Sequence, residues 1–146
     1  MIARVAVVFA LGGCIDKLEP TVGPPVREVC QNADHDLSRD VRFSADVSSI
    51  IDEYHCRDCH TPTGKTPIGI EVGGLDLSSY DSLRAGGVRS SGTIVIPGQP
   101  CESVLLQKVG EGPPFGSRMP LDGPPYLEAE DLDVISDWIF EGAVDD

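Results

Sequence analysis

Residues 54–60 read Tyr-His-Cys-Arg-Asp-Cys-His, and this stretch holds the densest set of possible metal ligands in the chain. Two of the five cysteines, Cys56 and Cys59, lie three positions apart, and His60 directly follows the second. Three chemistries use such a cluster: a structural zinc site, a redox-active dithiol, and the covalent attachment of a haem. The spacing and the rest of the sequence decide among them.

Covalent haem attachment explains the cluster best. A structural zinc site needs four ligands, usually from two spaced pairs, and the sequence has no second CxxC or HxxxH pair. A thioredoxin-type dithiol belongs to a βαβ unit, which this chain lacks. Haem attachment needs two thiols three residues apart for the vinyl groups, and an imidazole one residue later for the iron. We therefore interpret Cys56 and Cys59 as attachment residues and His60 as the proximal ligand of one haem c.

The first 14 residues, MIARVAVVFALGGC, resemble a bacterial lipoprotein signal peptide. Arg4 supplies a short positive region, and residues 5–11 form an apolar run too short to span a bilayer. The LGGC sequence resembles a lipobox, which implies cleavage before Cys14 and lipid attachment to its thiol. We expect residues 1–13 to be the signal peptide and the polar, proline-containing residues 14–40 to be a tether. The alternative is a hydrophobic first strand with a buried Cys14.

Export has consequences for the membrane and for the remaining cysteines. Ile15, directly after the lipidated cysteine, favours the outer membrane by resemblance to enteric sorting. Outside the cytoplasm, cysteines are oxidised or otherwise committed. With Cys14 assigned to lipid and two cysteines to haem, Cys30 and Cys101 remain. We predict that they form a disulfide worth about 4 kcal/mol in the chain-entropy model. Two unpaired thiols are the alternative.

The composition describes one small acidic domain. The 146 residues include 11 basic and 24 acidic side chains, a formal charge of −13. Signal-peptide cleavage would remove Arg4 and no acid, leaving 10 basic and 24 acidic residues and a charge of −14. Such a surface argues against a nucleic-acid partner and favours redox proteins with basic docking surfaces. Sparse aromatics, 16 Gly and 12 Pro predict short helices and long loops.

Helical spacing is clearest at the two ends of the predicted domain, residues 41–146. The first helix is expected to begin at the N-cap Ser44, with Asp46 in its first turn, and to run straight into the cysteine motif. Its apolar face consists of Val47, Ile50, Ile51 and Tyr54. The last helix is expected to end at Gly142, and its apolar face consists of Leu132, Ile135, Trp138 and Ile139.

The middle of the domain predicts shorter elements. Residues 61–74 are expected to be a loop, residues 79–85 a short helix closed by Gly86, and residues 93–99 a short extended run. A further helix over residues 100–109 has Pro100 near its start, and Gly110 ends it. Residues 110–126 then form a long loop with five prolines. Loops of this length in small domains tend to be functional.

Met119 lies in this proline-rich loop and is the predicted second axial ligand. The chain has two methionines, and the predicted signal peptide contains Met1. Met119 is flanked by Arg118 and Pro120, whereas a core methionine has apolar neighbours. A thioether ligand, a second histidine or an open site would each give the iron different chemistry. The alternative for Met119 is a surface or packing role.

The other two histidines are weaker candidates for that position. His55 directly precedes Cys56, so it is tethered to the edge of the ring and badly placed for the far face. His35 lies upstream in the predicted tether, where exposure is expected. Arg57 and Arg118 are candidate partners of haem propionates, although solvated charges are the commoner case.

These motifs together resemble the mono-haem class I cytochrome c family, and within it small secreted domains of planctomycete and myxobacterial type. The matching stretches are CRDCH (56–60), GGLDLSSYDSLRAGG (73–87), IVIPGQPCESVLLQKV (94–109), SRMP (117–120) and DVISDWIFEGA (133–143). The resemblance implies a mainly α fold in which the N- and C-terminal helices cross and one haem lies in a cleft. It also implies Cys56 and Cys59 as attachment sites, His60 as proximal ligand and Met119 as distal ligand. Thr61 and Glu128 depart from the family pattern, which often has Gly and a Ser cap at those places.

The function implied is one-electron transfer, because an iron with His and Met ligands has no open site for a substrate. No hydrolase, metalloprotease or dinucleotide motif occurs elsewhere in the chain. A haem enzyme or gas sensor, for example a peroxidase-like protein, is the alternative if Met119 is absent from the iron or easily displaced. A non-haem metal-binding or structural lipoprotein is the third possibility.

Overall fold

The computed structural model describes residues 30–146, and the chain is helical there, with no strand in that part. Helices account for 44% of these residues, which confirms the mainly α fold class. The predicted signal peptide, Cys14 and the first part of the predicted tether lie outside the described residues. Within residues 30–146, no helix is long and apolar enough to cross a membrane.

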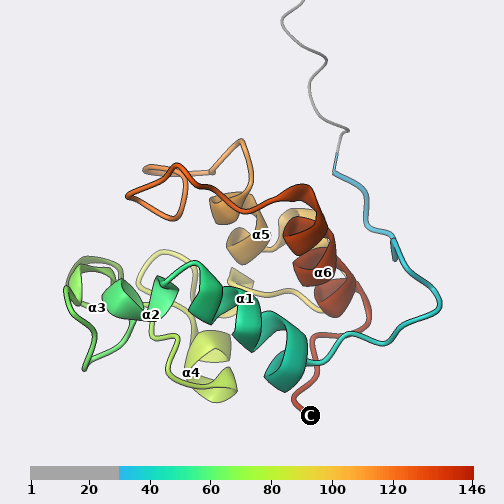
Figure 1. Cartoon of the computed structure of the whole chain (residues 1–146), viewed down its shortest axis with the longest axis horizontal. Helices are drawn as coiled ribbons and strands as arrows, with labels where there is room; N and C mark the ends of the chain where they lie inside the picture. Colours follow the sequence, from blue (N-terminus) through green and yellow to red (C-terminus); the bar gives the residue numbers. More distant parts are fainter. Residues whose placement is uncertain (1–29) are drawn as a thin grey trace, which may run out of the picture.

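Short helices follow one another around a small core, with long connections between them (Figure 1). Their order along the chain is η1 (Phe43–Val47), α1 (Ser48–Glu53), α2 (Cys56–His60), α3 (Ile68–Gly73), α4 (Tyr80–Ala85), η2 (Ser91–Thr93), η3 (Pro100–Glu102), α5 (Val104–Val109) and α6 (Ala129–Phe140). The first of these is a π-helical turn that continues into α1, and η2 and η3 are 3₁₀ turns.

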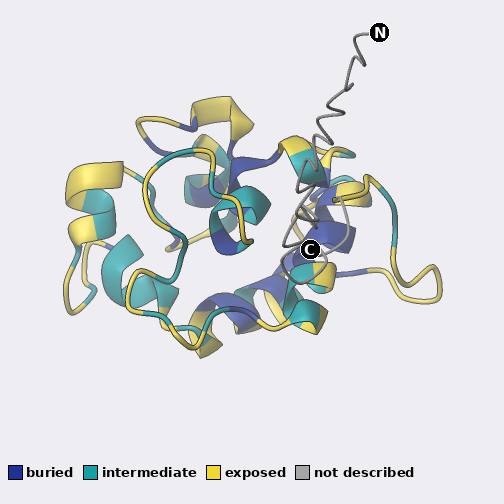
Figure 2. Ribbon diagram, turned by 90° about the horizontal axis from the view of Figure 1, so that it is seen from above, coloured by how far each residue is buried: buried dark blue, intermediate teal, exposed yellow. Residues whose placement is uncertain are grey.

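The core forms where the first and last helices meet. Val47 of η1 and Trp138 of α6 are fully buried, and the Phe43 ring lies 5.5 Å from the Trp138 ring. The Tyr80 ring of α4 lies 5.3 Å from Phe43 in an edge-on arrangement. Figure 2 shows buried positions on both of the terminal helices. The predicted packing of the N-terminal against the C-terminal helical segment is therefore present, and Trp138 is a core residue as expected.

The start of the first helix differs from the prediction. Arg42, not Ser44, is the N-cap, and its N–H donates to the Asp46 carboxylate at 2.8 Å. The N–H and hydroxyl of Ser44 both donate to the Asp146 carboxylate, at 3.0 and 3.2 Å. The prediction of Ser44 as the N-cap is therefore wrong. Its side chain is hydrogen-bonded to Asp146 at the C-terminal end of the chain and does not cap the helix.

The short helix α4 agrees with its sequence signals. Ser79 is the N-cap and forms a reciprocal capping box with Ser82. Gly86 ends the helix with a φ of 73°. A Cβ at this position would lie 2.2 Å from the carbonyl oxygen of Ser91, so both the backbone conformation and the close approach require glycine.

Three other middle segments correct the predictions. The predicted loop 61–74 contains α3. The predicted helix 100–109 is broken at Ser103, whose hydroxyl accepts the Ile96 N–H at 2.8 Å and donates to the Gln99 carbonyl at 2.9 Å. The predicted extended run 93–99 begins instead in η2, and Ile94 is helical with φ −57° and ψ −43°. Ile94 and Val95 are both buried in the core, and neither belongs to a strand.

Residues 30–40, part of the predicted tether, lie against the domain. Cys30 and Cys101 form a disulfide with a Cα–Cα distance of 5.7 Å across a sequence separation of 71. Asn32 adds to this attachment, because its side chain accepts the Cys101 N–H and donates to Glu102, each at 3.0 Å. The predicted boundary at residue 40 stays a prediction.

Candidate haem-binding site

The short helix α2 presents the two thiols and the imidazole of the cysteine motif together. The first helix does not run straight into this motif, because Tyr54 ends α1 and His55 takes a left-handed conformation with φ 54°. That reversal lets a new helix begin at Cys56 and carry Cys59 and His60. The His55 side chain is exposed. The contribution of His55 that the structure shows is therefore this backbone turn.

The His60 ring is oriented by a hydrogen bond that the sequence alone did not indicate. Nδ1 lies 3.1 Å from the carbonyl oxygen of Leu75, so Nδ1 carries the proton and donates it there. Among residues 30–146, no hydrogen bond engages Nε2. Burial lowers the pKa of His60, although the Leu75 hydrogen bond opposes the shift. The result is a neutral imidazole with a fixed tautomer, which is the form that binds metals.

The helix α3 closes tightly over the same ring at Gly69. A Cβ at this position would lie 2.5 Å from His60 Nδ1 and 2.7 Å from the Cys59 carbonyl oxygen. Any side chain at residue 69 would therefore push the imidazole out of its present place. A second main-chain contact on this side joins the Leu77 N–H to the His60 carbonyl at 2.7 Å. Helix α3 and the segment after it thus form a rigid support for the proximal ligand.

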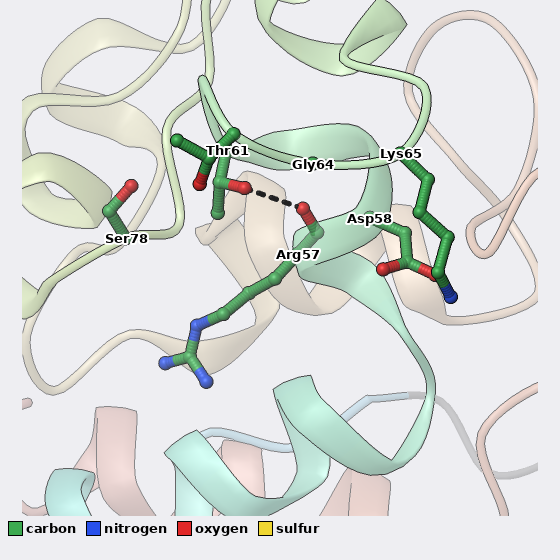
Figure 3. A pocket seen from close by; sticks show the side chains of 7 residues that line it. Arg57, Asp58, Thr61, Gly64, Lys65 and Ser78 are labelled. Atoms are coloured by element: carbon green, nitrogen blue, oxygen red, sulfur yellow. Dashed lines mark hydrogen bonds and ion pairs between the residues drawn. The ribbon is translucent and has the colours of Figure 1, made fainter.

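The opposite side of α2 carries an open polar pocket of about 530 Å³, shown in Figure 3. Its lining residues are Arg57, Asp58, Thr61, Thr63, Gly64, Lys65 and Ser78, which include none of the motif's cysteines or His60. Thr61, which directly follows His60, is buried and donates to the Arg57 carbonyl at 2.8 Å. Lys65 pairs with Asp58 at 2.7 Å. This side supports the helix and does not face the thiols.

Arg57 is also committed to this supporting side. Its Nε donates to the Leu77 carbonyl at 3.0 Å, and a terminal nitrogen donates to the Ser48 hydroxyl at 2.9 Å. A second terminal nitrogen pairs with Asp52. With these partners, the guanidinium joins α1, α2 and the segment after α3, so we assign it a structural role rather than a propionate contact.

The two motif cysteines are free thiols, and each is half-buried. Burial raises the pKa of the Cys56 thiol to about 11. Redox-active dithiols have the opposite property, a lowered pKa that gives a reactive thiolate. The environment of Cys56 therefore gives the dithiol alternative no support.

Met119 is half-buried against the core and is held through its main chain. Its N–H donates to the Lys108 carbonyl at the end of α5, at 2.8 Å. The Lys108 ammonium turns to the same loop, donating to the Phe115 carbonyl at 2.9 Å and to that of Ser117. The positive charge of Lys108 also contributes to the lowered pKa of His60. Lys108 thus attaches the loop that carries Met119 to the end of α5.

Arg118, the neighbour of Met119, is engaged within the same part of the molecule. Its Nε donates to the Val109 carbonyl at 2.9 Å, and its guanidinium lies 4.3 Å from the centre of the Tyr126 ring. This stacked position is a cation–π contact. The side chain of Arg118 therefore links the end of α5 to Tyr126, the last residue of the proline-rich loop.

His35 is occupied elsewhere. Its Nδ1 lies 2.6 Å from the buried carboxylate of Asp137 in α6, and its N–H donates to the same oxygen at 2.8 Å. The pKa of His35 is raised, chiefly by this hydrogen bond. The His35 side chain is exposed as expected, with 38% of it accessible, although its Nδ1 is engaged. The structure thus gives His35 a role in attaching residues 30–40 to α6.

Residues 56–120 match the family described as Planctomycete cytochrome C. This match supports a planctomycete-type cytochrome c domain in that part of the chain. The matched region begins at Cys56 and ends just after Met119, so it contains all four residues predicted to hold the haem. A cytochrome c domain indicates a haem-binding electron carrier. No curated protein and no solved structure matches the chain well enough to add to this comparison.

The residues of the cytochrome c domain fit a covalently bound haem. Two free thiols and one imidazole lie on a single short helix, and the imidazole nitrogen available to a metal is Nε2. Across residues 30–146, no group of three or more His, Cys, Asp or Glu side chains is placed to hold a metal ion. A structural zinc site needs four such ligands, so the arrangement gives zinc no support. The roles of Cys56, Cys59, His60 and Met119 in holding a haem stay predictions.

Sequence reasoning missed two supporting residues of the cytochrome c domain. Leu75 acts through its carbonyl oxygen, for which the identity of the side chain gives no signal. Lys108 lies in a predicted helix, where a lysine reads as an ordinary solvated charge. The only available hint was its position 11 residues before Met119, which is too weak to use without the fold.

Proposed function

We propose that this protein is a c-type cytochrome that transfers single electrons through one haem c. Cys56 and Cys59 are its covalent attachment residues, His60 is the proximal ligand and Met119 the distal ligand. The strongest support for this proposal is the orientation of the His60 ring. Its Nδ1–H is committed to the Leu75 carbonyl, and the neutral Nε2 stays available beside two free thiols. Haem iron, when bound there, supplies reversible Fe(III)/Fe(II) exchange.

The chain's own residues set the conditions for that exchange. The Leu75 hydrogen bond raises the basicity of the His60 ring and prevents its rotation. Gly69 and α3 shield the ring from water. Met119 would offer a soft sulfur ligand, which stabilises Fe(II) and raises the reduction potential. If His60 and Met119 both held the iron, no site would be left for a substrate, and one-electron exchange is the chemistry that the haem would supply.

We also propose that the carrier works outside the cytoplasm, held to a membrane by lipid at Cys14. The support is the lipobox-like sequence LGGC and the short apolar run before it. Ile15 favours the outer membrane. A net charge of −14 for the cleaved chain suits docking to redox proteins with basic surfaces. Electron exchange with a basic partner protein should therefore slow as the salt concentration rises, because salt screens the attraction.

A redox titration of the purified, haem-matured protein tests the electron-transfer function. We expect a reversible one-electron couple, and we expect it to vanish when Cys56 and Cys59 are both replaced by Ala. A matched control is the pair Cys30→Ala and Cys101→Ala, which removes the disulfide and leaves the motif intact. A high-spin protein that turns over peroxide, with no stable low-spin couple, would instead establish the haem-enzyme alternative.

A further inference from the structure

Lys108 contacts the Met119 segment at three main-chain points. The Lys108 carbonyl accepts the Met119 N–H at 2.8 Å. Its ammonium donates to the Phe115 carbonyl at 2.9 Å and to the Ser117 carbonyl. The ammonium also lies 5.2 Å from the centre of the Phe115 ring. One residue of α5 therefore binds the chain two and four residues before Met119, and at Met119 itself.

The segment that Lys108 holds has few other anchors, which are the Arg118 hydrogen bond to the Val109 carbonyl, the Arg118–Tyr126 contact and the packing of Phe115 and Met119 on the core. Residues 110–126 form no helix or strand, and they contain five prolines and several glycines. Met119 is in contact with the core, but its hydrogen bond to Lys108 is made by the main chain. Loops with few buried contacts open locally at low free-energy cost, whereas charge-assisted hydrogen bonds raise that cost. Loss of the ammonium would leave the Phe115 and Ser117 carbonyls without these donors.

We propose that Lys108 is the positioning residue for the distal ligand: its ammonium holds residues 115–119 in place and so determines how long Met119 stays on the iron. This inference rests on the proposed His60/Met119 ligation. Lys108 itself is not an iron ligand in this account. It acts through Met119, by restraining the loop that carries the sulfur.

Carbon monoxide binding to the reduced protein measures the opening of the distal side, because the gas binds only when Met119 has left the iron. Lys108→Leu removes the donors without adding a new ligand. We expect CO to bind at least about tenfold faster, which corresponds to the loss of one charge-assisted hydrogen bond. Lys108→Arg, which keeps charge and donors, should remain closer to wild type. Lys65→Leu is the matched control and should change nothing, because within residues 30–146 Lys65 pairs with Asp58 alone, on the far side of α2.

Hydrogen exchange gives a second readout that does not depend on the haem. In Lys108→Leu, amides of residues 115–119 should exchange about tenfold faster, while those of α6 keep their wild-type protection. Unchanged protection of residues 115–119 would overturn the inference. So would faster exchange with unchanged CO binding, since the loop would then not control the ligand. If Lys108→Leu loses protection in α6 as well, the milder Lys108→Gln replaces it in the same comparison.

Met119→Ala separates this inference from the proposed function. If Met119 is the ligand, this variant binds CO fast whatever residue stands at 108. If Met119→Ala instead binds CO at the wild-type rate, the proposed ligation fails, whereas a failure of Lys108→Leu alone leaves that ligation intact.

Discussion

The two sides of the proposed haem site are built in different ways. On the proximal side, the ligand's own side chain is fixed, since His60 Nδ1 donates to Leu75 and the ring abuts Gly69. On the distal side, Met119 is fixed through its main chain, by contacts with Lys108. A ligand locked by its ring stays in place when the loop around it moves. A ligand positioned only through its backbone leaves when its loop opens, so the distal side is the place where reactivity can change.

Removal of the two ligands should show this contrast at its largest. His60→Ala should abolish the low-spin spectrum and reduce the yield of mature protein, because the helix-borne imidazole has no substitute nearby. Met119→Ala should keep the covalent haem and lose the weak iron–sulfur band of the oxidised protein. Visible spectra of the two variants measure both effects. A persistent sulfur band in Met119→Ala would show that another residue is the distal ligand.

The support of the His60 ring should be sensitive to one added methyl group. Gly69→Ala introduces a Cβ at 2.5 Å from Nδ1, and we expect it to lower the free energy of unfolding by about 2 kcal/mol. Gly73→Ala, in the same helix, has no atom within 4 Å of the added Cβ and should stay within about 0.5 kcal/mol of wild type. Denaturant unfolding of both variants gives the comparison. Equal stabilities would mean that α3 yields easily and is no rigid support.

The same two sides differ in how far the sequence predicts them. Cys56, Cys59 and His60 are brought together by local spacing within one helix, so a five-residue motif suffices. The short helix predicted over residues 79–85 and its end at Gly86 also rest on local signals, and α4 confirms both. In contrast, α3 packs on His60 at Gly69, and the break at Ser103 involves hydrogen bonds to Ile96 and Gln99. These contacts between neighbouring segments leave no periodic hydrophobic pattern in the sequence.

Tyr54 connects the two regions, because it precedes the cysteine motif and contacts the helix that follows the Met119 loop. Its hydroxyl donates to Asp131 at 2.7 Å and accepts the Glu128 N–H at 3.1 Å. The Tyr54 hydroxyl thus provides a hydrogen-bond acceptor for the main-chain N–H of Glu128 at the start of α6, where Glu128 makes no side-chain cap. Tyr54→Phe should therefore lower the free energy of unfolding by about 1 kcal/mol. Tyr126→Phe is the control, as no hydrogen bond of its hydroxyl occurs within residues 30–146; equal losses would refute the bridging role.

The smallest expected effect lies away from both ligands, at the contact between His35 and Asp137. Hydrogen bonding to Asp137 raises the pKa of His35 above its ordinary value of 6.5. The contact therefore contributes its full share to the free energy of unfolding below about pH 6.5. This contribution is lost as the pH rises through the raised pKa of His35.

Asp133 also faces this imidazole, at 3.9 Å, and Asp34, Asp36, Arg39 and Glu130 surround it. Because the ring is partly exposed, we expect less than about 1 kcal/mol. Unfolding of wild type and His35→Gln between pH 6 and 9 measures it. The difference should shrink with rising pH, and a constant difference would exclude the charged contact.

The central claim is that Cys56 and Cys59 carry a haem whose iron is bound by His60 and Met119. The most direct test combines the intact mass and the visible spectrum of the full chain, produced in a host that attaches haem to exported proteins. We expect one haem that stays on the denatured polypeptide, a sharp low-spin α-band when reduced, and the iron–sulfur band when oxidised. A colourless chain, or haem that separates from the denatured polypeptide, would contradict it.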